Sequence, residues 1–197
     1  MNGASEPVTP LELYPEAAKA VGVEKLYFKR EDLHPYGSHK GRSIPVMIDH
    51  YARKGDRRFA ISSSGNAGIA AALHVHELNA GERATQPLDL EVYIGNHTAP
   101  HKAHRLEALA DEHIRVLLKE RPLQALTQAM NDGMRSLRQS TDDAALTGYA
   151  ALAQEIADEK DIGAVFMGTS SCTTAQALAA YFKKQKTPSQ VHIFQTS

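Results

Sequence analysis

The sequence lacks the features that mark disulfide-stabilised, membrane and nucleic-acid-binding proteins. Its 197 residues include one cysteine, Cys172, which excludes an internal disulfide framework and favours a reducing compartment. No stretch approaches the roughly 20 apolar residues of a membrane span, and no cationic start precedes an apolar run, as in a signal peptide. The 22 basic and 23 acidic residues give a net charge of −1, which argues against a dedicated nucleic-acid binder. We therefore expect a soluble cytoplasmic protein without nucleic-acid or membrane partners.

Short apolar runs alternate with helix-like segments along the whole chain. Strands are predicted at 25–30, 57–64, 88–95, 113–119, 162–168 and 190–195, and helices at 9–22, 39–55, 65–78, 100–110, 123–137, 148–160 and 173–185. Strands separated by helix-length segments are typical of parallel sheets, so the predicted fold class is α/β. The polar stretches 78–89 and 138–146 are predicted to be loops, and the second is a candidate hinge between lobes.

Three polar loops follow predicted strands, at the position where open α/β sheets bind ligands. Their sequences are HPYGSHKG, SSSGNAG and MGTSSCTT. Each combines glycine with serine, threonine or asparagine, so backbone N–H groups and small hydroxyls can approach a ligand closely. Helix capping alone explains the third loop well. The three serines of the second loop exceed what a cap needs, which favours a binding role.

One lysine, Lys40, lies where the first loop turns into a predicted helix. Most lysines are solvated surface residues, and Lys40 could be one of them. A nucleophilic lysine instead needs partial desolvation, which lowers its pKa so that a neutral amine exists near pH 7. A place at a strand-to-helix turn beside two polar loops would supply that desolvation.

Taken together, the loops resemble those of the fold type II pyridoxal-phosphate enzymes, which include tryptophan synthase β chains, threonine synthase, cysteine synthase and serine/threonine dehydratases. The stretch KREDLHPYGSHKGR resembles the motif whose lysine forms a Schiff base with the cofactor, which implies Lys40. The stretch SSSGNAGIAAA resembles the family's asparagine loop. By that resemblance Asn66 binds the cofactor's ring hydroxyl, and the loop Ser62–Ala67 holds the substrate carboxylate, chiefly through Ser63, Ser64, Gly65 and Ala67.

The stretch GTSSCT resembles the family's glycine-rich phosphate cup, which implies cofactor contacts from Gly168, Thr169, Ser170, Ser171, Cys172 and Thr173. Ser170 and Ser171 stand where glycines are usual, so their side chains would narrow the cup or add hydroxyl donors. The resemblance implies pyridoxal 5′-phosphate as cofactor, an amino acid as small-molecule substrate, and a homodimer. No metal site is expected, because His74 and His76 point to different faces of a predicted helix and His101 and His104 lack a third ligand.

The resemblance also implies an architecture: two lobes, three αβα layers and mostly parallel sheets. Residues 1–38 with 142–197 would form part of the larger cofactor-binding lobe, and 39–141 the smaller lobe with the asparagine loop. Family members usually continue well beyond this point, and a final parallel strand normally has a covering helix. The fold is therefore expected to be truncated at its C-terminus, without the side chain that faces the pyridine nitrogen.

The implied function is a lyase or synthase that acts on an amino acid by β-elimination or β-replacement, or at the γ-carbon, with Lys40 as the base for the α-proton. His39 resembles the tryptophan synthase motif and SSGNAG the cysteine and threonine synthase motifs, so no single substrate is indicated. Two alternatives stay open. The chain could be a non-catalytic or fragmentary protein on the same scaffold, or a thiol enzyme built on Cys172 at a helix N-terminus.

Overall fold

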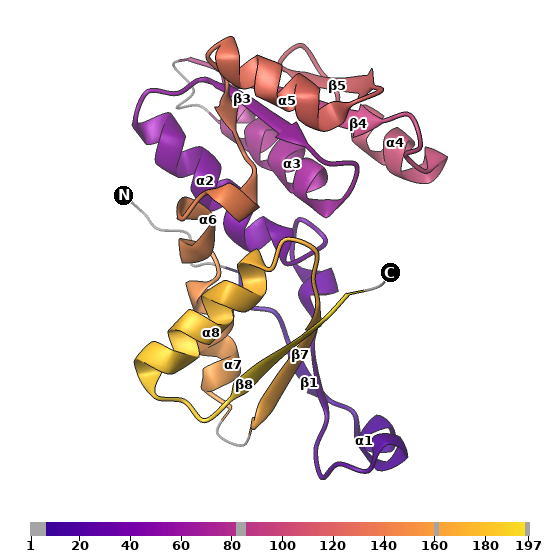
Figure 1. Ribbon diagram of the computed structural model, residues 1–197, viewed down its shortest axis with the longest axis vertical. Helices are drawn as coiled ribbons and strands as arrows, with labels where there is room; N and C mark the ends of the chain where they lie inside the picture. The colour runs from indigo at the N-terminus through magenta and orange to yellow at the C-terminus, as the bar shows by residue number, and fades with distance from the viewer. Residues whose placement is uncertain (1–6, 82–85, 160–161, 196–197) are drawn as a thin grey trace. The chain divides into compact units, whose positions relative to one another are not determined.

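The computed structural model describes residues 7–81, 86–159 and 162–195. Two compact units divide the chain (Figure 1): unit 1 is Met1–His39 with Tyr149–Ser197, and unit 2 is Lys40–Gly148. Each unit has its own buried apolar core. The core of unit 1 includes Leu152 and Leu178, and that of unit 2 includes Ile48 and Leu90. The division into lobes at 38/39 and 141/142 stays a prediction for the complete family fold.

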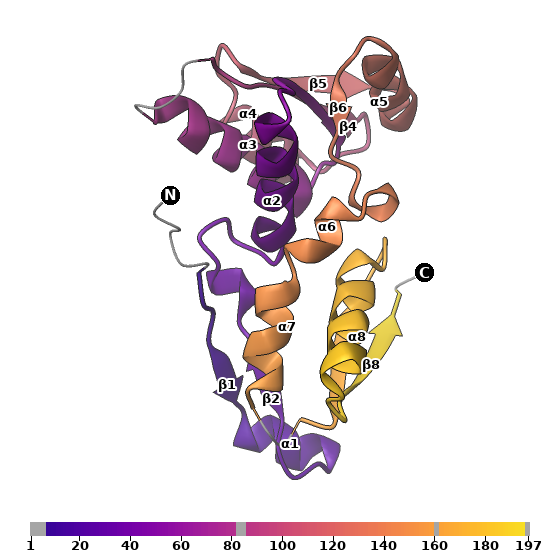
Figure 2. The same ribbon diagram turned by 90° about the vertical axis from the view of Figure 1, so that its left-hand side faces the viewer.

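Unit 2 is built around a four-stranded parallel sheet in the order β5–β4–β3–β6. Its strands are β3 (Arg58–Ser62), β4 (Asp89–Gly95), β5 (Ile114–Lys119) and β6 (Arg135–Ser136). One face is covered by α5 (Pro122–Asn131), whose Leu126 and Ala129 pack with Ala60, Tyr93 and Met134. The helices α2 (Lys40–Arg53), α3 (Asn66–Ala80) and α4 (Pro100–Glu107) lie on the other side of the sheet (Figure 2). This helix–sheet–helix arrangement confirms the predicted α/β class.

The helices α2 and α3 pack against each other. The two helices have different sequence patterns. Helix α2 is amphipathic and buries Ile44, Met47 and Ile48. Pro45 lies inside α2, where it lacks the N–H that would bond one turn back. Helix α3 buries a run of small residues, Ala70–Ala72, that lets its backbone approach its neighbours closely.

Unit 1 contains two small sheets. Strands β1 (Leu11–Leu13) and β2 (Tyr27–Lys29) pair antiparallel, and α1 (Pro15–Val21) lies between them in sequence. Strands β7 (Ala164–Gly168) and β8 (Gln190–Phe194) pair in parallel, joined by α8 (Thr173–Gln185), which packs against α7 (Ala150–Ala157). The Lys29 ammonium pairs with the Glu155 carboxylate on α7 and donates to the Thr9 carbonyl, which ties β2 to the helical layer.

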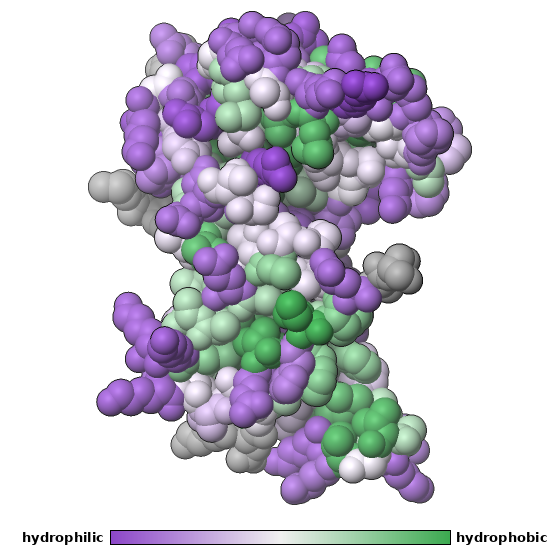
Figure 3. Space-filling model, viewed as in Figure 1, coloured by the Kyte–Doolittle hydropathy of each residue, from purple (hydrophilic) through white to green (hydrophobic). Residues whose placement is uncertain are grey.

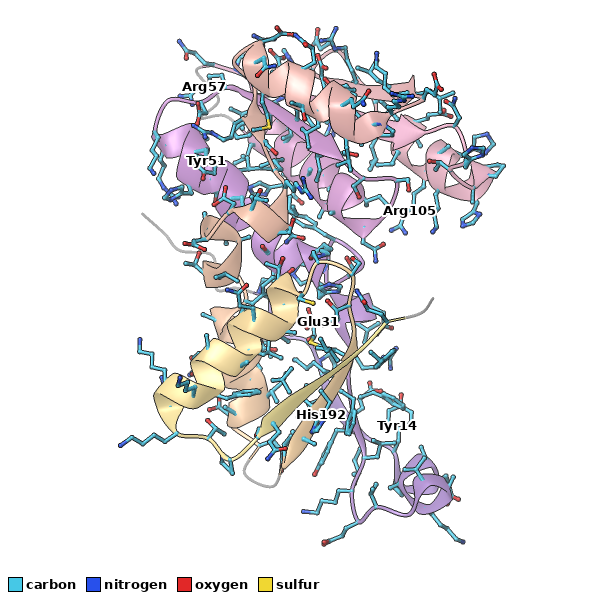
Figure 4. All side chains as sticks on the ribbon, in the orientation of Figure 1. Tyr14, Glu31, Tyr51, Arg57, Arg105 and His192 are labelled. Atoms are coloured by element: carbon cyan, nitrogen blue, oxygen red, sulfur yellow. The ribbon has the colours of Figure 1, made fainter. Side chains whose placement is uncertain are left out.

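The β7–β8 sheet has one strongly exposed face. Parallel sheets are normally covered on both faces, yet Phe166 is 70 % and Phe194 57 % exposed. The register places these two rings on the same face as His192, whose ring stacks on Phe166 at a centroid distance of 4.8 Å. Figure 3 shows apolar surface over unit 1, whereas the visible face of unit 2 is mostly polar; His192 is labelled in Figure 4.

Three predicted segments differ from the structure. The helix predicted over 9–22 begins only at Pro15, because Leu11–Leu13 forms a strand that pairs with β2. The predicted end of this helix is confirmed, since Gly22 caps it in the left-handed conformation at φ +75°. The helix predicted over 123–137 ends at Asn131, before Gly133 at φ +84° and β6. The loop predicted over 138–146 contains a 3₁₀ turn, η2 (Gln139–Thr141), and the start of a short helix, α6 (Ala144–Thr147).

No helix in the described part of the chain is long and apolar enough to cross a membrane.

Candidate active site

Lys40 is the first residue of α2 and is partly buried. Its ammonium nitrogen Nζ donates a hydrogen bond to Oε1 of Gln139 at 2.6 Å. Burial disfavours the charged form of an amine, and it holds the pKa of Lys40 below its ordinary value. The acceptor is a neutral amide rather than a carboxylate, so this hydrogen bond adds no negative charge that would counteract the effect. The lysine therefore has the desolvated environment that a nucleophilic or basic amine requires.

Gln139 reaches Lys40 from η2, 99 residues further along the chain, and is 8 % exposed. Two contacts fix the backbone on either side of it. Upstream, the Leu137 N–H donates to the Ala60 carbonyl of β3 at 2.9 Å. Downstream, the Asp142 carboxylate accepts from the Tyr51 hydroxyl at 2.6 Å, and Tyr51 lies on α2 (labelled in Figure 4). The amide acceptor is thus held between the sheet and the lysine's own helix.

The first turn of α2 also packs closely on α6. The Ser43 hydroxyl, fully buried, donates to the Ala145 carbonyl at 2.7 Å. Gly148 lies so near this turn that a Cβ atom would come within 2.3 Å of the Arg42 carbonyl oxygen. The backbone that carries Lys40 is therefore fixed by tight contacts on the α6 side.

The predicted carboxylate loop connects β3 to α3 within unit 2. The Ser63 N–H donates to the Tyr93 carbonyl at 3.2 Å, and the Ser63 hydroxyl accepts from the Gly65 N–H at 3.3 Å. Gly65 is the N-cap of α3 and Asn66 its first residue, which is exposed. Ser64 and Ala67 are half-buried on either side of this cap. The loop thus presents small polar groups and the N-terminus of a 15-residue helix, which suits a carboxylate.

The close approach of this loop to α3 requires Gly68. A Cβ atom at Gly68 would lie 2.6 Å from the Ser63 carbonyl oxygen and 3.2 Å from a methyl group of Val92. Any larger residue would push the loop away from the helix or the helix away from the sheet.

The predicted phosphate cup lies in unit 1, between β7 and α8. Gly168 ends β7, where a Cβ atom would come within 3.2 Å of the Phe194 ring. The Thr169 hydroxyl accepts from the Cys172 N–H at 2.9 Å, and the hydroxyls of Ser171 and Thr173 lie 3.1 Å apart. These contacts between residues two or three apart fold 169–173 into a compact turn. Ser170 is exposed in this turn.

The N-terminus of α8 supplies the donors of this cup. The first helical hydrogen bond runs from the Gln176 N–H to the Cys172 carbonyl, so the N–H groups of Thr173, Thr174 and Ala175 have no acceptor within the helix. They carry the partial positive charge of the helix dipole. Cys172 adopts a left-handed conformation at φ +57°, a backbone state that glycine favours. A cysteine thus fills a glycine-like position in the turn.

The structure brings the predicted residues together in two groups. Lys40 and the Ser62–Ala67 loop belong to unit 2, on helices that pack against each other, and Gly168–Thr173 belong to unit 1. Unit 2 also has a cavity of about 850 Å³ beside α5, lined by Tyr51, Leu126, Arg138 and Asp142 among others, but by none of the predicted site residues. Within the described residues no group of three His, Cys, Asp or Glu side chains could hold a metal ion.

A family model described as pyridoxal-phosphate dependent enzyme matches residues 4–197. The chain belongs to this family. Its cofactor is pyridoxal 5′-phosphate, and the donor sets fit that molecule. A desolvated amine suits an aldehyde, and N–H groups and hydroxyls at a helix N-terminus suit a phosphate.

Several known proteins are similar to this chain. The human serine dehydratase-like protein is 32 % identical over 152 residues, which cover 76 % of this chain and 43 % of that protein. The structure of a pyridoxal 5′-phosphate-dependent aspartate racemase matches at a TM-score of 0.83 and 21 % identity, over 95 % of this chain and 57 % of that one. The structure of the processed form of threonine deaminase isoform 2 from Solanum lycopersicum matches at a TM-score of 0.80 and 24 % identity. That match covers 96 % of this chain and 51 % of the deaminase chain.

The chain spans about half the length of each of these relatives. The two structures, at under 25 % identity, show the shared fold.

Three residues at or near the site are not among those predicted from the sequence, and their local signals differ in strength. Gln139 lies in a polar stretch that predicts a loop, and no local pattern connects it to Lys40. Gly68 could have been found from the second glycine of GNAG, whose place inside a predicted helix indicates a close packing contact. Gly148 has a weaker signal, because a glycine before a helix normally indicates only a turn.

Proposed function

We propose that this chain carries the lysine and the substrate-carboxylate loop of a pyridoxal-phosphate-dependent lyase or synthase. The substrate is an amino acid, and the reaction is elimination or replacement at its β-carbon, or at the γ-carbon. The observation that carries the proposal is the environment of Lys40: a partly buried amine, at the start of a helix, with a lowered pKa and a neutral hydrogen-bond partner.

The residues of the chain then have distinct tasks. Lys40 would hold the cofactor at its aldehyde carbon through Nζ, and as a neutral amine Nζ would accept the substrate's α-proton. Asn66 binds the cofactor's ring hydroxyl. The Ser62–Ala67 loop orients the substrate carboxylate, and Gly168–Thr173 hold the phosphate through backbone N–H groups. When bound, pyridoxal phosphate supplies the electron sink that stabilises negative charge at the substrate's α-carbon.

Reductive trapping tests the assignment of Lys40. The purified chain is incubated with pyridoxal 5′-phosphate at neutral pH, reduced with borohydride and mapped by peptide mass spectrometry. We expect modification to concentrate on Lys40, because burial lowers the pKa of its amine and so favours the neutral, nucleophilic form. A Lys40→Ala variant should lose the visible absorbance of the bound cofactor and keep its circular dichroism spectrum.

A Lys54→Ala variant is the matched control, because Lys54 is exposed at the end of α2 and should not affect trapping. Modification spread evenly over the lysines, or unchanged absorbance in Lys40→Ala, would refute the assignment. Release of a 2-oxo acid from an amino acid would indicate elimination, and a new amino acid formed with an added nucleophile would indicate replacement.

A second reading is a non-catalytic or fragmentary pyridoxal-phosphate-binding protein. It is favoured by the length of the match, about half of each relative, and by serines in the phosphate cup. This reading predicts trapping at Lys40 without turnover of any amino acid.

The thiol-enzyme alternative has less support. The thiol of Cys172 is half-buried and makes no hydrogen bond to a histidine within the described residues. We further propose that the protein is a cytoplasmic homodimer, which sedimentation equilibrium and cell fractionation would test.

A further inference from the structure

We infer that the cavity beside α5 is a second ligand site, separate from the candidate active site, and that it binds a free α-amino acid with a large apolar side chain. Its volume of about 850 Å³ lies within the range of small-molecule sites, roughly 300–1,000 Å³. All of its lining residues belong to unit 2, and none is a predicted site residue. The inference does not depend on the proposed function, because it concerns different residues.

One wall of the cavity is an apolar stripe on α5. Leu123, Leu126 and Met130 follow one another at intervals of three and four residues, so they share one face of the helix. Leu126 is buried in the core, but Leu123 is 56 % and Met130 51 % exposed. A second methionine, Met134, lines the cavity from the segment after α5 and is buried. Methionine side chains adapt their shape and make favourable contacts with aromatic rings, so this wall suits a bulky apolar group.

The charged groups of the cavity come from residues 51–56 and 135–143, and most of them are already paired. The Arg135 guanidinium donates to the Asp56 carboxylate at 2.9 Å and lies 4.3 Å from the centre of the Tyr51 ring. The Asp142 carboxylate accepts from the Tyr51 hydroxyl at 2.6 Å, and from the Ala144 N–H at 2.9 Å (Tyr51 is labelled in Figure 4). These three charges therefore have partners within unit 2 and need none from a ligand.

Two opposite charges remain, Arg138 and Asp143, one on each side of η2, and both are exposed. Arg138 Nε donates to the Ser140 hydroxyl at 3.2 Å, whereas its terminal nitrogens have no hydrogen-bond partner among the described residues. Asp143 is the N-cap of α6, and its side chain makes no capping hydrogen bond. An α-amino acid carries the complementary pair, a carboxylate for the guanidinium and an ammonium group for the aspartate. The cavity thus offers a partner to each end of the amino acid and to its apolar side chain.

The charge balance of the cavity disfavours other ligands. Its ionisable lining consists of two arginines and three aspartates, so no excess of positive charge awaits a polyanion such as a nucleotide. A fatty acid would leave Asp143 without a partner, and an apolar amine would leave Arg138 without one. A zwitterion with an apolar side chain is the class that satisfies both charges and the α5 wall.

Calorimetric titration of the purified chain with L-phenylalanine tests the inference. Two analogues each lack one charge: 3-phenylpropionate has no ammonium group, and 2-phenylethylamine has no carboxylate. We expect saturable binding of L-phenylalanine, and each analogue should bind about 5–10-fold more weakly, the value of one charge-assisted hydrogen bond at an exposed site.

Variants of the two charged residues should give a crossed pattern. Arg138→Gln should weaken L-phenylalanine and 3-phenylpropionate by that factor and leave 2-phenylethylamine unchanged. Asp143→Asn should weaken L-phenylalanine and 2-phenylethylamine and leave 3-phenylpropionate unchanged. Met130→Ser should weaken all three ligands by about 2–5-fold, because it removes apolar contact area. All three variants change exposed side chains and should keep the fold.

Matched controls locate the binding. Arg53→Gln and Glu107→Gln remove charges at exposed helix ends outside the cavity and should bind like wild type. Absence of saturable L-phenylalanine binding would overturn the inference. So would binding that Asn66→Ala weakens and the cavity variants leave unchanged, because the amino acid would then occupy the candidate active site. No cofactor is added, so a failure to trap pyridoxal phosphate at Lys40 would refute the proposed function without affecting this result.

Discussion

Replacement of Gly148 by alanine tests whether the backbone around Lys40 is as tightly packed as the structure indicates. A Cβ atom at this position would lie 2.3 Å from the Arg42 carbonyl oxygen and 2.6 Å from Ser43 Cα. Both are backbone atoms, which cannot swing aside as a side chain would. Restoring even a 3.0 Å contact requires α6 and α2 to separate by at least about 0.7 Å, which would stretch the bond from the Ser43 hydroxyl to the Ala145 carbonyl.

The expected size of the effect follows from two opposing contributions. Gly148 has φ −67°, which alanine adopts without strain, so reduced freedom of the unfolded chain would stabilise the variant by about 0.4–1 kcal/mol. Overpacking costs about 1–3 kcal/mol, and contacts with backbone place this site at the upper end. We therefore expect the free energy of unfolding to fall by about 2 kcal/mol.

Urea denaturation followed by circular dichroism measures this change. Gly163→Ala is the control, because nothing lies within 4 Å of a Cβ atom there, and its free energy of unfolding should stay the same or rise slightly. Equal free energies of unfolding for Gly148→Ala and Gly163→Ala would show that α6 does not pack as closely on the first turn of α2 as the structure indicates.

Three further predictions concern other contacts. Gly68→Ala should destabilise the protein in urea despite a gain of about 1 kcal/mol in helix propensity, because its Cβ atom would lie 2.6 Å from the Ser63 carbonyl oxygen; unchanged stability would contradict that packing. Burial lowers the pKa of Lys40, so between its folded and unfolded pKa values the unfolded chain binds more protons and stability rises with pH. Lys40→Met should accordingly be more stable than wild type at neutral pH, by a margin that shrinks as the pH is raised; a constant margin would refute the linkage. Glu155→Gln should lower the free energy of unfolding by about 3 kcal/mol, since it leaves the Lys29 ammonium, 12 % exposed, without its carboxylate. The double variant Lys29→Met/Glu155→Leu should recover most of that loss in thermal melts.

Local patterns predicted those parts of the fold that local interactions determine. The helix Thr173–Gln185 has the predicted bounds, because its amphipathic pattern and its polar start are contained in the segment itself. The strand Leu11–Leu13 does not follow from the sequence, because three residues show no period and its partner, Tyr27–Lys29, lies beyond an intervening helix. The strand Arg135–Ser136 has only two residues and pairs with Phe59–Ala60, far away in sequence.

The same distinction applies to the candidate site. The place of Lys40 at a helix start follows from the turn residues that precede it, and the polar loops follow from the ends of predicted strands. The hydrogen-bond partner of Lys40 cannot be predicted in this way. All four strands of the unit 2 sheet lie between Lys40 and Gln139 in the sequence, and only the folded sheet brings the two side chains together. The family resemblance likewise transfers motifs but not a contact made by a residue outside them.

The uncovered face of the β7–β8 sheet affects how the chain must be handled in the laboratory. Solvatochromic dyes such as ANS fluoresce on accessible apolar surface, and the rings of Phe166 and Phe194 offer such surface in the native state. In dye-based melting curves the native protein would already give high fluorescence, so the increase in fluorescence on unfolding would be small. Spectroscopic probes that need no added fluorophore are the sound choice for this protein, and a loss of dye signal on mixing with another polypeptide would indicate that the face has been covered.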